Sequence, residues 1–398
     1  MKICLISKYP PIEGGESSKA YWLAKGLGER GHEIHLVTNA WEVESRYREH
    51  FEVEDLKQLS PKNVFVHNTD PFVDPSFIPY TKPYTEKIAS LAVEIVREYN
   101  LQLIDSWYIL PYVVSGYIVK TITGKPQVLR HAGSDITRLF NSPYLNTLFL
   151  EIFRRADKIV IYPGEKSFFK KIGIPEEKIF LNKVSVDTNA FNPNIDSFDL
   201  AKHTDKNVNL PIITYIGKVG VTKGIFELTQ ALSGIKDDFI LLSVCGGEAY
   251  NQRLRQDIKN KKLESKTIIL DFVPPWKIPS IIKASTCVVI PERDFPVLGH
   301  TPILSREAMS TGKCTLLSEE LYNKRSYKDL EDGVHTVVVN PMDIDSFRGK
   351  LYKIIKNLSY AQEIGKNARK LAERNEDFNE YLDITEKLYK EFEVPLNI

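Results

Sequence analysis

Short apolar runs alternate with longer amphipathic stretches along most of this chain. The runs are rich in Val, Ile and Leu, as in Lys2–Ile6 and Ile212–Ile216, which is typical of strands buried on both faces. The stretches between them place apolar residues three or four positions apart, and Ser17–Arg30 is an example that ends at Gly31. Strands that alternate with helices in this way predict parallel sheets covered by helices.

Thirteen strands are predicted from this pattern. They are Lys2–Ile6, Glu33–Thr38, Val64–His67, Leu103–Ser106, Gln127–His131, Lys158–Tyr162, Lys178–Leu181, Ile212–Ile216, Phe239–Val244, Thr267–Asp271, Thr286–Pro291, Lys313–Ser318 and His335–Val339. The chain from Ser346 onward has no such run, and its spacing predicts two or three helices.

A polar, turn-rich segment separates the first seven predicted strands from the last six. We predict two domains, residues 1–195 and residues 212–375, joined by a linker at 196–211. A C-terminal helix at 376–398 is expected to complete the first domain. The predicted fold class is α/β, with two Rossmann-like, doubly wound parallel sheets facing a central cleft. A ligand is expected at the carboxyl ends of the strands.

The composition is that of a folded, nearly neutral protein. The chain has 398 residues, a formal net charge of +1 and 42% hydrophobic residues, which excludes long disorder and argues against nucleic acid as a partner. The apolar run Ile3–Ile6 is too short for a signal peptide, and no run is long enough to cross a bilayer. The four cysteines lie in apolar runs, so we expect buried thiols and a cytoplasmic protein. Phe168–Lys171 is a candidate for a peripheral membrane contact.

Two loops between a strand and a helix are candidates for binding phosphate. The first contains Gly14 and Gly15, which let a backbone approach a ligand closely. The second contains Gly217, Lys218 and Lys223, whose ammonium groups suit a diphosphate. Neither loop matches a dinucleotide fingerprint or a Walker A motif. The simpler interpretations are a glycine-hinged turn and a solvated pair of lysines.

Two further residues are candidates for contacts to a substrate. His131 ends a predicted strand, where an imidazole can polarise a substrate or a leaving group. Glu307 lies on a predicted helix and can accept hydrogen bonds from a ribose. A structural histidine and an exposed helical glutamate are the simpler interpretations. No histidine or cysteine spacing is typical of a metal site, and the Asp343–Asp345 string is better explained as a helix cap.

Five segments of the chain occur in an order that one protein family shares. They are Gly14-Gly15 followed by LAKGLGERGHEIHLVT, then RRADKIVIYPGEKSFFKKIGIPEEKIFLNKVSVDTNAF, YIGKVGVTKG, CGGE and REAMSTGK. Together they resemble the GT-B glycosyltransferases, specifically the large retaining family four, over nearly the whole chain. The resemblance implies the GT-B fold and a nucleoside-diphosphate sugar as the donor.

The resemblance also implies a role for each candidate residue. Lys218 and Lys223 would stabilise the donor diphosphate, and His131 would lie beside the sugar; these are the expected catalytic residues. Glu307 would bind the nucleotide ribose. The positions expected to bring their backbone to the donor are Gly14, Gly15, Gly217, Ile303 and Leu304.

One region departs from the family pattern. The family has a second glutamate eight positions before the one at 307, and Gly299 stands there in this chain. The preceding segment, ERDFPVLGHTP, is longer than expected. It offers Glu292, Asp294 and His300 as substitutes in the sugar-facing part of the pocket. The donor sugar and its base are therefore left open.

The sequence thus favours a retaining glycosyltransferase that moves a sugar from a nucleoside-diphosphate sugar to an acceptor hydroxyl. No cofactor and no metal are expected, because the two lysines supply the positive charge. The acceptor and the oligomeric state are left open. Two alternatives remain: a nucleotide-sugar epimerase or hydrolase on the same scaffold, and a non-catalytic subunit that binds a sugar nucleotide.

Overall fold

The structure is a computed structural model that describes residues 1–44, 51–71, 82–245, 248–297 and 300–393. The chain forms two compact units. The first comprises Met1–Ser185 together with Phe378–Ile398, and the second comprises Val186–Asp377. The predicted boundaries were residues 195 and 376, and the segment expected as a linker lies inside the second unit.

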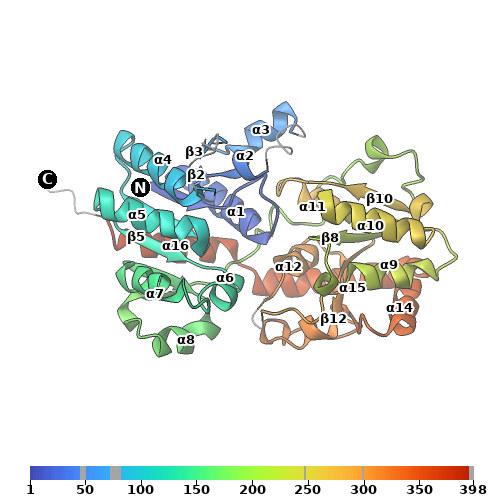
Figure 1. Ribbon diagram of the computed structural model, residues 1–398. Helices are drawn as coiled ribbons and strands as arrows, with labels where there is room; N and C mark the ends of the chain where they lie inside the picture. The colour runs from blue at the N-terminus through green and yellow to red at the C-terminus, as the bar shows by residue number, and fades with distance from the viewer. Residues whose placement is uncertain (45–50, 72–81, 246–247, 298–299, 394–398) are drawn as a thin grey trace. The chain divides into compact units, whose positions relative to one another are not determined.

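The first unit is built on a seven-stranded parallel sheet, shown on the blue and green side of Figure 1. The strand order is β3-β2-β1-β4-β5-β6-β7, so the order reverses between β1 and β4. The strands are β1 (Lys2–Ser7), β2 (Glu33–Thr38), β3 (Val64–Asn68), β4 (Leu103–Trp107), β5 (Gln127–Arg130), β6 (Lys158–Ile161) and β7 (Ile179–Leu181). The helices are α1 (Gly15–Glu29), α2 (Ala40–Val43), α3 (Val53–Leu59), α4 (Tyr84–Glu98), α5 (Val114–Thr123), α6 (Gly133–Arg138), α7 (Asn146–Arg155), α8 (Lys166–Lys171) and α16 (Phe378–Lys390).

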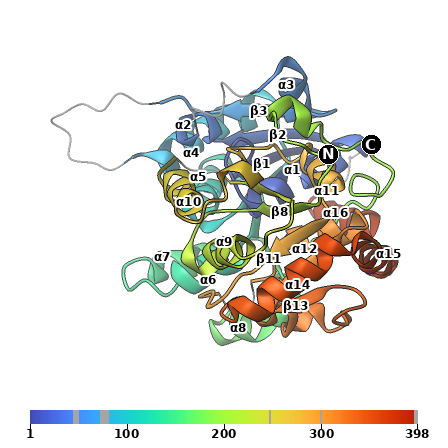
Figure 2. The same cartoon turned by 90° about the vertical axis from the view of Figure 1, so that its right-hand side faces the viewer.

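The second unit has a six-stranded parallel sheet in the order β10-β9-β8-β11-β12-β13, which reverses between β8 and β11. Figure 2 shows helices of this unit beside its strands. The strands are β8 (Ile212–Ile216), β9 (Ile240–Val244), β10 (Thr267–Leu270), β11 (Cys287–Ile290), β12 (Cys314–Ser318) and β13 (Val337–Val339). The helices are α9 (Ile225–Ser233), α10 (Glu248–Asn260), α11 (Ile278–Ala284), α12 (Ile303–Ser310), α13 (Glu319–Tyr322), α14 (Ile344–Lys356) and α15 (Leu358–Asn375).

All thirteen predicted strands are present, and each end lies within two residues of its predicted position. The prediction succeeds because both faces of each sheet are covered. In β8, for example, Ile213 and Tyr215 belong to one hydrophobic cluster, whereas Ile212 belongs to another. Alternate residues of a strand point to opposite faces, so a strand with apolar residues on both faces needs a continuous apolar run.

The cysteines and the predicted helix cap follow the sequence analysis closely. All four cysteines are buried and free, and three of them lie in strands, while Cys245 follows β9 directly. Asp343 caps α14, because its side chain accepts a hydrogen bond of 3.0 Å from the backbone N–H of Ser346. The aspartate string therefore begins a helix, as predicted.

The aromatic pair that was a candidate for a membrane contact belongs to the core of the first unit. Phe169 is fully buried, and Phe168 packs against the same hydrophobic cluster. Phe169 is thus unavailable to a membrane surface, whereas Phe168 is only partly buried, and the peripheral contact at Phe168–Lys171 stays a prediction. Within the part of the chain that the structure describes, no helix is long and apolar enough to span a bilayer.

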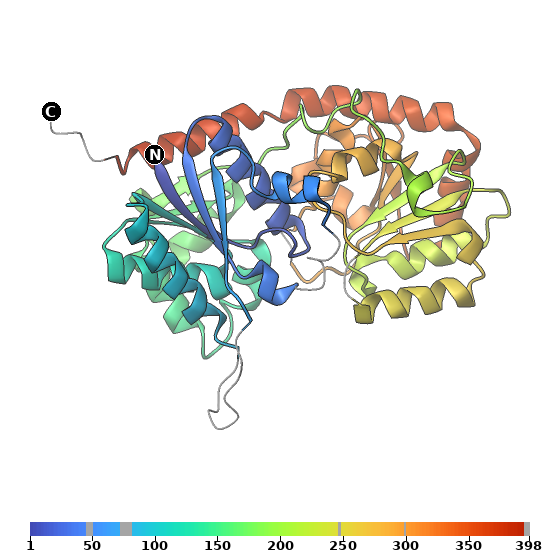
Figure 3. The same cartoon turned by 90° about the horizontal axis from the view of Figure 1, so that it is seen from above.

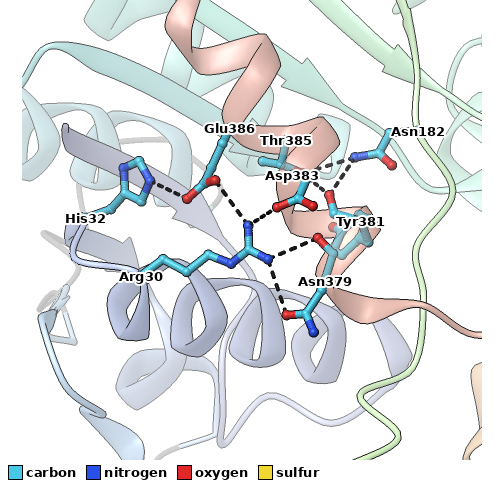
Figure 4. Close-up of polar contacts among 8 residues, drawn as sticks. All are labelled: Arg30, His32, Asn182, Asn379, Tyr381, Asp383, Thr385 and Glu386. Carbon is cyan, nitrogen blue, oxygen red and sulfur yellow. Dashed lines mark hydrogen bonds and ion pairs between the residues drawn. The ribbon is translucent and has the colours of Figure 1, made fainter.

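The C-terminal helix α16 packs on the first unit beside α1, and Figure 3 shows it along the elements that open the chain. Figure 4 shows the polar contacts that hold it. Nη1 of Arg30 lies 2.5 Å from Asp383 and 3.1 Å from Glu386, and Glu386 also lies 3.0 Å from Nε2 of His32. On another side of the helix, Asn182 donates a hydrogen bond of 3.0 Å to the Thr385 hydroxyl. The last helix is thereby fastened to both early and late parts of the unit.

Candidate functional site

The candidate phosphate-binding loop of the second unit begins where β8 ends. Gly217 and Lys218 follow β8, and Glu292 follows β11, two residues after its end. These strands are neighbours, and the strand order reverses between them. In open parallel sheets, ligands bind at the carboxyl ends of strands where the order reverses. The topology therefore brings the predicted lysine loop and the start of the segment ERDFPVLGHTP to one place in this unit.

The lysine loop is held tightly against the end of β11. Val221–Lys223 forms a single 3-10 turn, and Gly224 ends it with a φ of 69°, a conformation that favours glycine. A Cβ atom at Gly224 would lie 1.9 Å from the carbonyl oxygen of Pro291. The backbone N–H of Arg293 also donates a hydrogen bond of 3.0 Å to the carbonyl of Thr222. Direct backbone contact thus fixes the position of the loop.

The two lysines of the loop differ in their surroundings. The side chain of Lys218 is exposed and has no ion-pair partner among the residues that the structure describes. Lys223 is about one-fifth exposed; its Nζ forms an ion pair with Glu292 and lies 4.1 Å from the centre of the Phe295 ring. One ammonium group of the predicted pair is therefore open to solvent, while the other already has an anion beside it.

Glu292 is the centre of a small charged cluster. Its side chain is buried, and its second oxygen, Oε2, lies 3.0 Å from Nε2 of His300. The His300 ring stacks on Phe295, with 4.2 Å between ring centres. Burial raises the pKa of the Glu292 carboxyl, but His300 and Lys223 outweigh burial and leave the pKa below its usual value. The Glu292 carboxylate therefore has Lys223 beside one oxygen and His300 beside the other.

Asp294 is separate from this cluster. Its side chain is largely exposed, and Oδ2 lies 2.8 Å from Nη1 of Arg293. Arg293 in turn donates hydrogen bonds of 2.9 and 2.6 Å to Oε1 of Glu227 on α9. Of the three candidates in the segment ERDFPVLGHTP, the structure thus brings Glu292 and His300 to Lys223 and leaves Asp294 in a surface ion pair.

The remaining candidates of the second unit lie on α12. Ile303 and Leu304 are its first two residues, so their backbone N–H groups have no acceptor within the helix. Glu307 is buried on the same helix, and the simpler interpretation of an exposed glutamate is wrong. Gly299, and Gly246 and Gly247 of the CGGE motif, lie outside the described residues.

In the first unit, Gly14 and Gly15 stand at the start of α1. Gly14 precedes the first residue of the helix with a φ of 121°, and both glycines are exposed. A Cβ at Gly14 would meet no atom within 4 Å, so the backbone conformation, and not space, calls for glycine here. Gly217 of the second unit has a φ of 153° and is likewise restricted by conformation.

His131 directly follows β5, and its side chain is completely buried between two carboxylates. Nε2 lies 3.2 Å from Oε2 of Glu165, and Nδ1 lies 4.0 Å from Oδ1 of Asp135. Burial lowers the pKa of the His131 imidazole, but Glu165 and Asp135 raise it above its ordinary value overall. Burial also raises the pKa of the Asp135 carboxyl to about 6. The two carboxylates therefore favour the protonated form of this buried imidazole.

Beside His131, the first unit contains a polar cavity that the sequence analysis missed. Its lining includes Trp107, Arg130, Asn182 and Tyr381, each with a buried polar atom that has no hydrogen-bond partner among the described residues. Arg130 also forms a buried ion pair with Asp105, at 2.9 Å. No local spacing points to this group, because its members come from separate strands and from the C-terminal helix.

No metal site is evident in the second or first unit as far as the structure describes them, since no three His, Cys, Asp or Glu side chains are grouped to hold an ion. The chemistry that the arrangement offers is electrostatic. An exposed lysine, a paired lysine and the open N–H groups of a helix start can stabilise negative charge on a bound anion. Glu292 and His300 add hydrogen-bonding groups next to that charge.

The two doubly wound parallel sheets define a GT-B fold, and solved structures of this class match it along the chain. Sucrose-phosphate synthase from Thermosynechococcus elongatus is 16% identical with a TM-score of 0.70, and each chain is 98% covered. The Anabaena protein Alr3699/HepE in complex with UDP-glucose is 18% identical with a TM-score of 0.67, covering 98% of this chain and all of the other.

The sequence comparisons then give the family. Residues 196–371 match the family described as "Glycosyl transferases group 1". The chain is also 25% identical over 281 residues to N-acetyl-alpha-D-glucosaminyl L-malate synthase from Bacillus anthracis, a match that spans 67% of this chain and 66% of that relative. The family match lies within the second unit, and enzymes of this group transfer sugar from a nucleotide-sugar.

Proposed function

We propose that this chain is a retaining glycosyltransferase that moves a sugar from a nucleoside-diphosphate sugar to an acceptor hydroxyl. The observation that carries the proposal is the loop with Lys218 and Lys223, which follows β8 at the point where the order of the second sheet reverses. The family match of this unit and the open N–H groups at the start of α12 support the same donor site.

In the proposed reaction, the bond between the sugar and the diphosphate breaks first. Negative charge grows on the departing diphosphate, and Lys218 and Lys223 stabilise it; one preorganised donor of this kind is worth about 2.7–4 kcal/mol. The acceptor hydroxyl attacks the same face of the sugar, and the departing phosphate takes its proton. Glu307 holds the ribose in this scheme. The lysines replace a divalent metal in this scheme.

The printed names of the relatives suggest which substrates to test first. Alr3699/HepE was solved with UDP-glucose, and the Bacillus anthracis relative is named N-acetyl-alpha-D-glucosaminyl L-malate synthase. We therefore propose UDP-sugars as the first donors and a hydroxy-carboxylic acid as the first small acceptor. Glycans and lipid-linked acceptors are the other classes to include.

The test begins with binding. A thermal-shift panel of UDP-, GDP- and ADP-sugars is run on the wild type, on Glu307→Ala and on Glu363→Ala, an exposed glutamate of α15 that serves as a matched control. We expect one nucleotide to raise the melting temperature of the wild type and of Glu363→Ala, and not of Glu307→Ala. Equal shifts for all three nucleotides, or for all three proteins, would contradict the proposed donor site.

Product analysis then separates the alternatives. The selected donor is incubated alone and with each acceptor class, and the anomeric configuration of the product is read by NMR. A new glycoside with the configuration of the donor supports retaining transfer. Product from the donor alone identifies an epimerase or hydrolase instead, and binding without turnover on any acceptor identifies a non-catalytic subunit.

A further inference from the structure

Within the second unit, the candidate phosphate-binding residue Lys223 already has an anionic partner. Its ammonium group is paired with Glu292, while Lys218 on the same loop has no such partner in the described part of the chain. The Phe295 ring covers a further side of Lys223 at 4.1 Å. The anion beside Lys223 is therefore supplied by the protein itself.

We propose that Glu292 is a displaceable counter-ion of Lys223, so that a nucleoside diphosphate must exchange with Glu292 to gain this lysine. The inference rests on the proposed function, because it assumes that the diphosphate binds at the lysine loop. In this proposal Glu292 is a positioning residue. It holds Lys223 in place before the diphosphate binds, and the ion pair forms again when the product leaves.

Glu292 is built to stay in place during such an exchange. It directly follows Pro291, whose carbonyl oxygen is in contact with Gly224, and the next residue, Arg293, is bonded through its backbone to Thr222. The carboxylate is thus fixed by the backbone of two adjoining loops. Lys223, by contrast, reaches it through a long flexible side chain. The lysine, and not the glutamate, is the group that moves.

His300 remains a partner of Glu292 when Lys223 moves to the phosphate. When Lys223 turns to a phosphate, the buried Glu292 would lose the ammonium group beside it. His300 lies 3.0 Å from its other oxygen and remains there, held by stacking on Phe295. The backbone carbonyl of His300 also accepts a hydrogen bond of 2.8 Å from Lys324. Glu292 therefore keeps a partner after the lysine has left.

The exchange predicts that removing the negative charge of Glu292 strengthens diphosphate binding. Glu292→Gln keeps the shape of the side chain but no longer competes for Lys223, so the site gains net positive charge for the ligand. We expect isothermal calorimetry to show UDP, GDP or ADP, whichever the wild type binds, binding roughly threefold to tenfold tighter to Glu292→Gln. The parent nucleoside, which has no phosphate, is expected to bind both proteins equally.

Two further variants test the cause. Asp345→Asn removes a carboxylate that pairs with Arg348 and not with either lysine, and we expect it to leave diphosphate affinity unchanged. In a Lys223→Met background, the gain from Glu292→Gln is expected to disappear, because no lysine remains to be released. In steady-state turnover, Glu292→Gln is expected to lower both the KM for the donor and kcat, since the product diphosphate leaves more slowly.

Unchanged or weaker diphosphate binding by a folded Glu292→Gln protein would overturn the exchange, as would a gain that persists without Lys223. If Glu292→Gln does not fold, Glu292→Asp gives the same test. The shorter side chain lengthens the ion pair, and a smaller gain in affinity is expected. Failure of the wild type to bind any of the three diphosphates would overturn the donor site itself, an outcome distinct from binding that Glu292 does not influence.

Discussion

Tyr389 donates a hydrogen bond of 2.5 Å from its hydroxyl group to Oδ2 of Asp105, although the two residues are 284 positions apart in the chain. Asp105 lies in β4, at the centre of the first sheet, and is also paired with Arg130 of β5. Both partners are completely or almost completely buried. The last helix is thus tied directly to a buried ion pair of the first unit.

Two buried tyrosines of α16 give a matched test of this contact. Tyr389→Phe removes a hydrogen bond to a buried carboxylate, and we expect a loss of about 1–3 kcal/mol in the free energy of unfolding. The hydroxyl of Tyr381 has no partner among the described residues, so Tyr381→Phe is expected to be neutral or slightly stabilising. Urea denaturation of both variants and the wild type measures the difference.

The comparison between the two tyrosines carries its own control, since each substitution deletes one oxygen atom from the same helix. If Tyr381→Phe were the more destabilising change, the Tyr381 hydroxyl would have a partner in the polar cavity. The prediction that the Tyr389 hydroxyl contributes more to stability would then be wrong. Tyr144→Phe, at a position that is 93% exposed, sets the background level.

Gly224 is the position where the lysine loop depends most on the absence of a side chain. Gly224→Ala adds a Cβ that would meet the carbonyl oxygen of Pro291, and it also places a side chain at a positive φ. Gly333→Ala has a comparable φ of 77° but nothing within 4 Å. We expect Gly333→Ala to cost about 1–2 kcal/mol from conformation alone, and Gly224→Ala to cost more.

The readout of this prediction is twofold. Chemical denaturation gives the difference in stability between the two glycine variants, and a thermal shift with the selected nucleotide gives the effect on binding. Gly224→Ala is expected to lose the shift because the loop must move away from β11, whereas Gly333→Ala keeps it. Equal stability of the two variants would show that the loop yields to the added methyl group without cost.

The sequence predicts the fold better than the site, for a physical reason. Each strand is a local run of apolar residues, so all thirteen can be found without knowing their neighbours. The lysine loop and α12 are likewise local motifs. The pairing of Lys223 with Glu292 joins residues 69 positions apart, and only the adjacency of β8 and β11 brings them together.

Local sequence patterns also do not predict the environment of a side chain. His131 was predicted at the end of a strand and is found there, but its burial between Glu165 and Asp135 depends on the segment that follows β6 and on α6. Phe168 and Phe169 are neighbours in the chain, yet Phe169 is fully buried and Phe168 only partly. Amino-acid type alone does not distinguish these cases.

Lys313 gives a prediction for the dependence of stability on pH. Burial, together with the nearby Lys283, lowers the pKa of Lys313 to about 8. The unfolded chain keeps this lysine protonated up to its ordinary pKa of 10.5, so between pH 8 and 10.5 the unfolded state binds more protons than the folded state. Stability from this group therefore rises with pH through that window.

The measurement is urea denaturation at several pH values from 7 to 10 of the wild type, Lys313→Met and Lys366→Met, the last being an exposed lysine of α15. We expect Lys313→Met to be more stable than the wild type at pH 7 by about 2–3 kcal/mol, with the difference shrinking as the pH rises. Lys366→Met should follow the wild type throughout. A difference between Lys313→Met and the wild type that does not change with pH would refute the assignment.

Removing either lysine of the donor loop should lower turnover, but the two substitutions should differ in their effect on stability. Under the proposed function, Lys218→Ala and Lys223→Ala each lower turnover by about a hundredfold to a thousandfold, because each loses charge stabilisation of the departing diphosphate. Lys218 is exposed, so its loss should leave the free energy of unfolding within about 0.5 kcal/mol of the wild type. Lys223→Ala deprives the buried Glu292 of a partner and should cost about 1–3 kcal/mol.

Turnover assays and urea denaturation of both variants and of Lys223→Ala/Glu292→Gln test this prediction. The double variant should regain stability and remain inactive, and near-normal turnover of either single variant would remove that lysine from the mechanism.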